Sequence, residues 1–106
     1  MLDPQLKRGL LDNCVLAALV GEDSYGYKII RDLAPYIEIS ESTLYPILKR
    51  LEQSGCLTVY SVEHNGRLRK FYHLTPRGAQ RIPEFLEDFS QIRSVYEYVY
   101  RRWHHE

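Results

Sequence analysis

The sequence has few cysteines and no long apolar run, and both absences narrow its class. Its two cysteines, Cys14 and Cys56, lack the spacing of a zinc site and are too few for a disulfide framework, so we expect two buried thiols. The longest apolar stretch, residues 14–20, is too short to span a bilayer, and charges interrupt the N-terminus where a signal peptide would be apolar. We therefore expect a cytoplasmic protein with no metal, no cofactor and no membrane contact.

Catalytic patterns and an excess of one charge are also lacking. The histidines form no arrangement with a cysteine or serine that is typical of nucleophilic catalysis, and no glycine-rich phosphate loop is present. The sequence therefore predicts a protein that is not an enzyme. Its 14 basic and 14 acidic residues cancel, which does not favour nucleic-acid binding unless the charges are unevenly placed. A chain of 106 residues suits one domain with a modest core.

Helical periodicity appears in three segments of the first half. Apolar residues recur at spacings of three and four over residues 5–20, about 24–34 and 41–54. Ser24 and Ser40 are the predicted N-caps of the second and third helices, because a serine hydroxyl accepts hydrogen bonds from the unpaired N–H groups there.

The pattern changes period after the third helix. Residues 57–63 and 68–74 alternate in polarity around Asn65-Gly66, the dipeptide most typical of a tight hairpin turn. Residues 37–39 also alternate and could form a very short strand. Thr75-Pro76 predicts the start of a final long helix, with threonine as N-cap and proline in the first helical position.

This order of elements is mainly α with a small β-hairpin, as in a winged helix-turn-helix with a C-terminal dimerisation helix. We expect residues 1–75 to form the winged helix-turn-helix DNA-binding domain. Residues 76–106 would form the dimerisation helix, as part of the same compact domain. In such a fold the third helix enters the DNA major groove, and the hairpin, or wing, reaches the neighbouring backbone or minor groove.

Positive charge is concentrated around the predicted wing. Five basic residues and no acidic one lie between His64 and Pro83, namely Arg67, Arg69, Lys70, Arg77 and Arg81. Phosphate binding needs a basic patch rather than a basic total charge. The alternative interpretation is a solvated hairpin whose charges prevent pairing with other strand edges.

The start of the third helix carries small hydroxyl side chains that suit phosphate oxygens as well as helix capping. Tyr25 and Tyr27, near the second helix, either contact the DNA backbone or simply pack. The predicted DNA-binding residues are Tyr25, Ser40, Ser42, Thr43, Tyr45, Lys49, Arg67, Arg69 and Lys70.

The final helix carries an apolar seam at alternating spacings of three and four. The predicted dimer interface consists of Phe85, Phe89, Ile92, Tyr96, Val99 and Trp103. The alternative is a helix that folds back on its own domain. Phe89 and Tyr96 are either ordinary dimer core or the walls of a site for a planar aromatic ligand. Pro83 predicts a kink in this helix.

Three segments resemble the PadR-like family of transcriptional regulators. They are Ser24-Tyr25-Gly26-Tyr27, residues 40–52 with Thr43-Leu44-Tyr45-Pro46, and residues 66–78 with Arg69-Lys70-Phe71-Tyr72. The resemblance covers about residues 8–80, and the short C-terminal helix is similar to that of the small subfamily. Two positions depart from the family pattern: Phe89 stands where some members have a stacking tryptophan, and Pro83 interrupts the last helix.

The resemblance implies a dimeric winged-helix repressor of a nearby operon, often one for detoxification or efflux, bound to a palindromic operator. It implies DNA contacts for residues of the third helix and wing, and in some members a planar aromatic inducer between the dimer halves. The residues that match those contacts are Ser42, Thr43, Tyr45, Lys49, Arg67, Arg69 and Lys70. The second hypothesis is a winged-helix protein-interaction module without DNA contact. The basic wing favours the first hypothesis, and the neutral total charge leaves the second open.

Overall fold

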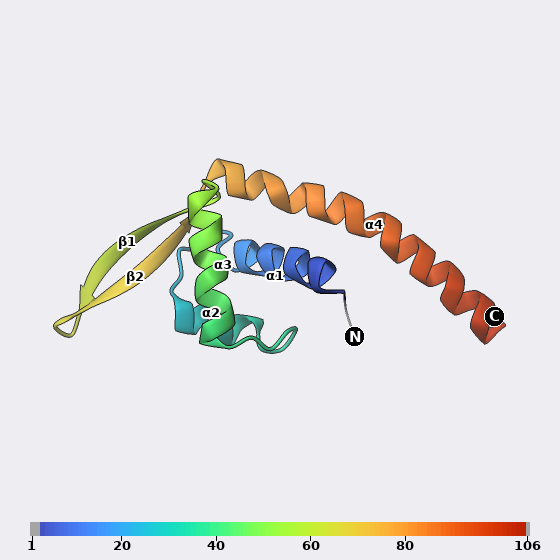
Figure 1. The fold of residues 1–106 in the computed structure, drawn as a ribbon, viewed down its shortest axis with the longest axis horizontal. Coiled ribbons are helices and arrows are strands. Elements are labelled where there is room, and N and C mark those ends of the chain that lie inside the picture. Colours follow the sequence, from blue (N-terminus) through green and yellow to red (C-terminus); the bar gives the residue numbers. More distant parts are fainter. Residues whose placement is uncertain (1–2, 106) are drawn as a thin grey trace.

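The computed structural model describes residues 3–105 and contains four helices and one two-stranded antiparallel sheet. The order confirms the predicted fold class, mainly helical with a β-hairpin (Figure 1). The elements are α1 (Pro4–Ala18), α2 (Gly26–Leu33), α3 (Glu41–Gln53), β1 (Leu57–His64), β2 (Arg67–Leu74) and α4 (Pro76–His104).

Side-chain caps begin three of the helices. The Asp3 carboxylate accepts hydrogen bonds from the backbone N–H groups of Gln5 (3.1 Å) and Leu6 (3.2 Å) at the start of α1. Ser40 caps α3 by accepting from the Thr43 N–H at 3.3 Å. Thr75 caps α4 in the same way. The predicted caps Ser40 and Thr75 are therefore confirmed.

The predicted cap of α2 is wrong. The N-cap is Tyr25, which makes no side-chain capping hydrogen bond. Ser24 instead pairs with β2: its N–H donates to the Tyr72 carbonyl at 3.2 Å and its carbonyl accepts from the Tyr72 N–H at 2.8 Å. This pairing extends the backbone at Ser24 and buries its side chain, which prevents the hydroxyl from reaching the helix.

The predicted strand at residues 37–39 is also wrong, because this segment has no regular structure. Ile39 is buried and Ile37 is half-buried, whereas Glu38 is exposed. The alternation in sequence therefore reflects a coil that runs over the core. A strand would need a neighbouring strand to hydrogen-bond with, and the only sheet among residues 3–105 is the hairpin.

The core lies between α1, α2, α3 and the base of the hairpin. The helical spacing of Leu44, Ile47, Leu48 and Leu51 predicts one apolar stripe on α3, and all four side chains are buried. Burial of one such side chain contributes about 1.5–3 kcal/mol. The buried apolar residues are Leu11, Val15, Leu16, Leu19, Ile29, Leu33, Ile39, Leu44, Ile47, Leu48, Leu51, Cys56, Leu57 and Tyr72.

The hairpin projects from this core as a wing (Figure 1). Its register runs from Leu57 opposite Leu74 to His64 opposite Arg67. The turn residues Asn65 and Gly66 both have positive φ, 52° and 78°, as a type I′ turn requires. Each strand extends one residue further toward the turn than the predicted 57–63 and 68–74.

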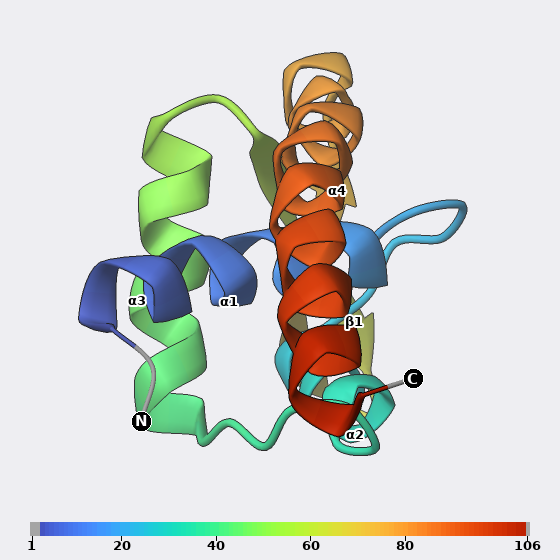
Figure 2. The ribbon, with the colours of Figure 1, turned by 90° about the vertical axis from the view of Figure 1, so that its right-hand side faces the viewer.

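Only the first part of α4 packs against the core. Gly78 is buried and Ile82 contacts the core cluster, while Phe85 and Phe89 are half-buried. Every residue from Ser90 to His105 is exposed. Figures 1 and 2 show α4 passing over α1 and then leaving the rest of the molecule. With α4 included, the structure measures 61 × 25 × 24 Å.

Pro83 does not break α4, which is continuous over its 29 residues.

No helix within residues 3–105 combines the length and hydropathy needed to cross a membrane.

Candidate nucleic-acid interface

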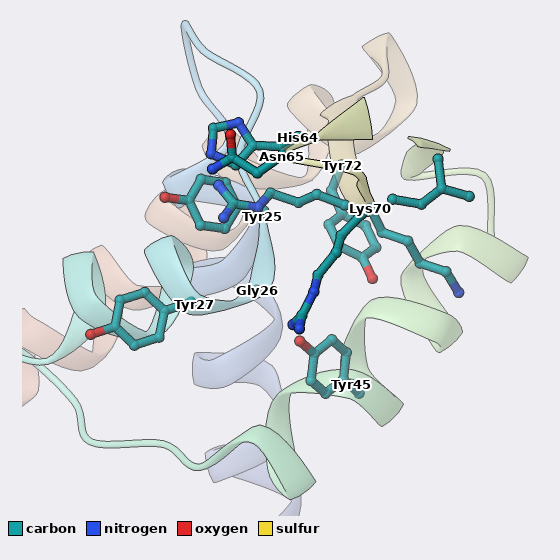
Figure 3. Close-up of a pocket in the computed structure, with 11 residues that line it drawn as sticks. Tyr25, Gly26, Tyr27, Tyr45, His64, Asn65, Lys70 and Tyr72 are labelled. Atoms are coloured by element: carbon teal, nitrogen blue, oxygen red, sulfur yellow. The ribbon is translucent and has the colours of Figure 1, made fainter. Parts of the chain in front are cut away.

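A hollow of about 690 Å³ lies between the wing, the start of α2 and the exposed side of α3. Figure 3 shows side chains from all three elements directed toward it. It collects five of the predicted DNA-binding residues, namely Tyr25, Tyr45, Arg67, Arg69 and Lys70, together with Gly26, Tyr27, His64, Asn65, Leu68 and Tyr72.

The remaining predicted DNA-binding residues lie on α3 and its cap, outside the hollow. The Ser40 and Ser42 hydroxyls are 2.9 Å apart, and the Ser40 hydroxyl lies 3.2 Å from that of Thr43. These hydroxyls hold one another and cap the helix while remaining exposed. Lys49 is exposed further along α3. The surface thus joins a hydroxyl-rich helix start to cationic side chains of β2.

Tyr25 packs against the wing. Its ring makes an edge contact with Phe71, at 5.4 Å between centroids. The Arg69 guanidinium lies over the Tyr25 ring, 4.3 Å from its centroid. This cation–π contact orients the Arg69 guanidinium beside the hollow that both residues line.

A hydrogen-bonded cluster that the sequence did not predict ties the wing to the α1–α2 loop. The Asp23 carboxylate accepts from the Tyr60 hydroxyl of β1 at 2.6 Å and lies 2.7 Å from Nδ1 of His73 on β2. The hydrogen bond from Tyr60, and then the contact with His73, hold the pKa of Asp23 below its usual range. No sequence signal marked this cluster, because its members are separated by 37 and 50 positions.

A second unpredicted cluster joins α1 to both α3 and α4. The buried Asp12 carboxylate forms an ion pair with Arg50 of α3, and its other oxygen lies 3.6 Å from Arg81 of α4. Arg81 also lies 3.6 Å from the Cys56 sulfur. Arg81 therefore lies at the α1–α4 junction, and the basic patch of the wing consists of Arg67, Arg69 and Lys70.

Both cysteines are free thiols, but the expected burial is confirmed only for Cys56. Cys14 is half-buried, and burial raises the pKa of its thiol. Cys56 is fully buried, which opposes ionisation. Hydrogen bonds from Ser54 and Arg81, together with the positive charges of Arg81 and Arg77, outweigh that effect and lower the pKa of its thiol.

The predicted dimer seam lies along one side of α4. Phe85 and Phe89 are half-buried with ring centroids 4.9 Å apart, and the later seam residues are exposed, up to 79% for Trp103. A hollow of about 590 Å³ lies along the same side and includes both predicted ligand residues, Phe89 and Tyr96. The structure thus brings these two rings to one apolar surface.

The sequence matches the "Transcriptional regulator PadR-like family" over residues 15–84. The chain belongs to this family. The matched region runs from α1 through the wing to the first part of α4, so it contains the hollow and the whole of α3. The family consists of transcriptional regulators, which confirms the prediction that the chain is not an enzyme.

Solved structures of similar proteins, several of them described as PadR-family regulators, share the fold. The protein smu.1704 from Streptococcus mutans UA159 is 38% identical, with a TM-score of 0.79 and 89% of each chain covered. A PadR family regulator from Eggerthella lenta DSM 2243 is 30% identical, with a TM-score of 0.78, covering 90% of this chain and 85% of that chain. Bacillus subtilis PadR, solved in complex with operator DNA, is 26% identical with a TM-score of 0.67, over 73% of this chain and 46% of its own.

Proposed function

We propose that this chain is a homodimeric repressor that binds a palindromic operator through α3 and the wing. The observation that carries the proposal is the exposed surface that joins the α3 hydroxyls to three basic residues of β2, in a member of a regulator family. The similarity to Bacillus subtilis PadR, solved with operator DNA, supports a duplex as the partner. A repressor must reach its operator DNA, so we propose that the protein is cytoplasmic.

The proposed contacts divide between two kinds of group. The Ser40, Ser42 and Thr43 hydroxyls stand at a helix N-terminus, where partial positive charge favours phosphate oxygens. Tyr45 and Lys49 lie one helical turn apart on α3, and in this proposal both side chains enter a groove. Tyr25 contributes by orienting the wing, whose contacts are Arg67, Arg69 and Lys70.

The proposed dimer forms through the α4 seam. Ile92, Tyr96, Val99 and Trp103 are all exposed, and they extend the half-buried Phe85–Phe89 pair into a continuous apolar stripe. A contiguous apolar surface of this kind marks a protein interface, and a seam with heptad spacing favours a second copy of the same helix. A two-fold dimer would place its recognition helices about 34 Å apart, one turn of DNA.

A planar aromatic effector is the proposed means of release. The hollow beside Phe89 and Tyr96 borders the dimer seam, so a ligand there would favour one angle between the two copies over another. DNA accepts only the angle that matches its half-site spacing, and the ligand would shift the population off the operator. Scattering of the dimer with and without a ligand measures that change of shape.

The test is binding to a fluorescent duplex from the upstream region of the gene, titrated at several salt concentrations against an unrelated duplex. Each phosphate neutralised by the protein steepens the dependence of affinity on salt. Arg69→Ala with Lys70→Ala should weaken binding to every duplex and reduce the slope by about 2. The control, Arg101→Ala with Arg102→Ala, removes the same charge from the far end of α4 and should leave the slope unchanged.

The competing function is a protein-interaction module, favoured by the zero net charge. It predicts weak binding to every duplex and no difference between the two double variants. A steep salt slope with clear preference for the upstream duplex contradicts it.

A further inference from the structure

Gly26 is the first residue of α2, and its backbone conformation does not explain why it is a glycine. The glycines that adopt positive φ, where a side chain would be strained, are Gly21, Gly55 and Gly66. Gly26 is not among them, so any residue could take its backbone angles. Glycine is moreover a poor residue inside a helix, by about 0.5–1 kcal/mol relative to alanine.

Space is what Gly26 provides, and Tyr45 of α3 uses it. A Cβ atom at Gly26 would lie 2.5 Å from the Tyr45 hydroxyl oxygen, 3.0 Å from Cζ and 3.2 Å from Cε1. Both residues line the hollow, and Figure 3 shows the Tyr45 ring on α3 directed toward the segment that holds Gly26. The Tyr45 phenol therefore rests against the start of α2, where any larger residue would displace it.

Tyr45 is otherwise weakly held. Its side chain is 45% exposed, and its hydroxyl makes no hydrogen bond to any of residues 3–105. The hydroxyl is thus free for another molecule, while the contact with α2 limits where the ring can lie. This combination suits a recognition side chain, because a group held before binding loses less conformational entropy when it binds.

We infer that Gly26 is a positioning residue for DNA recognition, which acts by setting the location of the Tyr45 hydroxyl on the α3 surface. The inference rests on the proposed function. This positioning role differs from a purely structural role, because a Cβ at Gly26 would meet the end of the exposed Tyr45 side chain, which can swing outward. At Gly78, by contrast, a Cβ would lie 2.0 Å from the backbone carbonyl of Cys56, which cannot move without the chain.

The experiment is a double-mutant cycle on operator affinity with Gly26→Ala, Tyr45→Ala and the double variant. Gly26→Ala should weaken binding on the order of tenfold, as expected for the loss of one DNA contact, and should leave the melting temperature unchanged or raised. In the Tyr45→Ala background the same substitution should change affinity less than about twofold, because the side chain it displaces is absent.

Gly9→Ala is the matched control. Gly9 lies inside α1, and a Cβ there would meet no atom within 4 Å, so this variant should keep both affinity and stability. Wild-type affinity for Gly26→Ala, or an equal loss with and without Tyr45, would overturn the inference. So would a loss of affinity that is accompanied by unfolding at the assay temperature.

A measurement without DNA separates this inference from the proposed function. In the wild type, nuclear Overhauser contacts should join the Tyr45 ring protons to the Gly26 α-protons, and in Gly26→Ala the ring should lose its contacts with α2. If the wild type binds no duplex, the proposed function and the role in recognition both fail. Ring contacts that Gly26→Ala leaves unchanged overturn the positioning role, whatever the DNA result.

Discussion

Two regions of the chain carry apolar faces, but they differ in what covers those faces. In the N-terminal body, which we define as residues 3–82, the stripes of α1, α2 and α3 meet and bury one another. In the distal part of α4, residues 90–105, the apolar side chains are all exposed. Helical periodicity therefore identifies an apolar face in both regions, but it does not show whether that face packs against the same chain or another molecule.

This difference also concerns stability. The helices of the body are short, α2 having 8 residues, and they persist because they pack together. The distal part of α4 has no packing partner within residues 3–105, and a helix of this length is marginal alone in water. The comparison predicts that changes in the distal part act on assembly, and that changes in the body act on folding.

The largest expected effect is loss of the dimer through Val99→Glu. A charge at this seam position would be buried without a partner in both copies, a cost of several kcal/mol. Sedimentation should show monomers at concentrations where the wild type is dimeric. The control is Tyr98→Glu. Tyr98 is 59% exposed and the adjacent Val99 is 57% exposed, but Tyr98 points away from the seam, so this variant should stay dimeric. If Val99→Glu also stays dimeric, α4 does not form the interface.

Gly78→Ala tests how the start of α4 packs within the body. A Cβ at this position would lie 2.0 Å from the Cys56 carbonyl oxygen and 2.9 Å from its carbon, so α4 would have to move away from β1. We expect a loss of about 3 kcal/mol in the free energy of unfolding by denaturant. Gly9→Ala, with open space, should cost nothing or stabilise. Equal stability of both variants would show that the start of α4 is loosely packed.

Asp12→Ala should weaken the body by about 1–2 kcal/mol, because the carboxylate holds Arg50 of α3 and Arg81 of α4 together. The loss is smaller than for a fully buried pair, since both arginines keep contact with water. The control is Asp32→Ala, which breaks the exposed pair with Lys28 (2.9 Å) and should cost below about 0.5 kcal/mol. If urea unfolding shows the same loss of stability for both variants, Asp12 does not hold α3 and α4 together.

The smallest effect concerns the anchor of the wing at Asp23. Its pKa is lowered in the folded chain, first by the Tyr60 hydrogen bond and then by His73. The stabilisation is therefore present above the unfolded pKa, near 4, and is lost as the pH falls through the lower folded value. The difference in melting temperature between the wild type and Asp23→Asn should shrink below about pH 4. A difference independent of pH would exclude ionisation of Asp23 as the cause.

Much of the fold could be predicted from neighbouring residues. Ser40 and Thr75 indicated two helix starts, and Asn65-Gly66 indicated the hairpin turn, because caps and tight turns depend on groups within a few positions. The same reasoning failed at Ser24, where pairing with Tyr72 outweighed capping. It failed again at residues 37–39, where burial of two isoleucines imitated a strand.

The candidate site could be predicted in part. The basic residues of β2 and the hydroxyls of α3 were visible in the sequence, but not the arrangement that supports them. The contacts of Arg69 with Tyr25 and of Asp23 with Tyr60 and His73 join segments that are distant in the chain. Arg81 belonged by sequence to the basic wing, and the structure places it against Asp12.

The sequence by itself determined the elements, the heptad seam and the basic strand, since these follow from local conformational preference and the spacing of side chains. The tertiary structure alone decided which side chains support the surface: the position of Tyr45 over Gly26, the anchor at Asp23 and the junction at Asp12. It also decided where the seam leaves the body and becomes exposed. These features depend on the three-dimensional approach of separate segments, which no local pattern encodes.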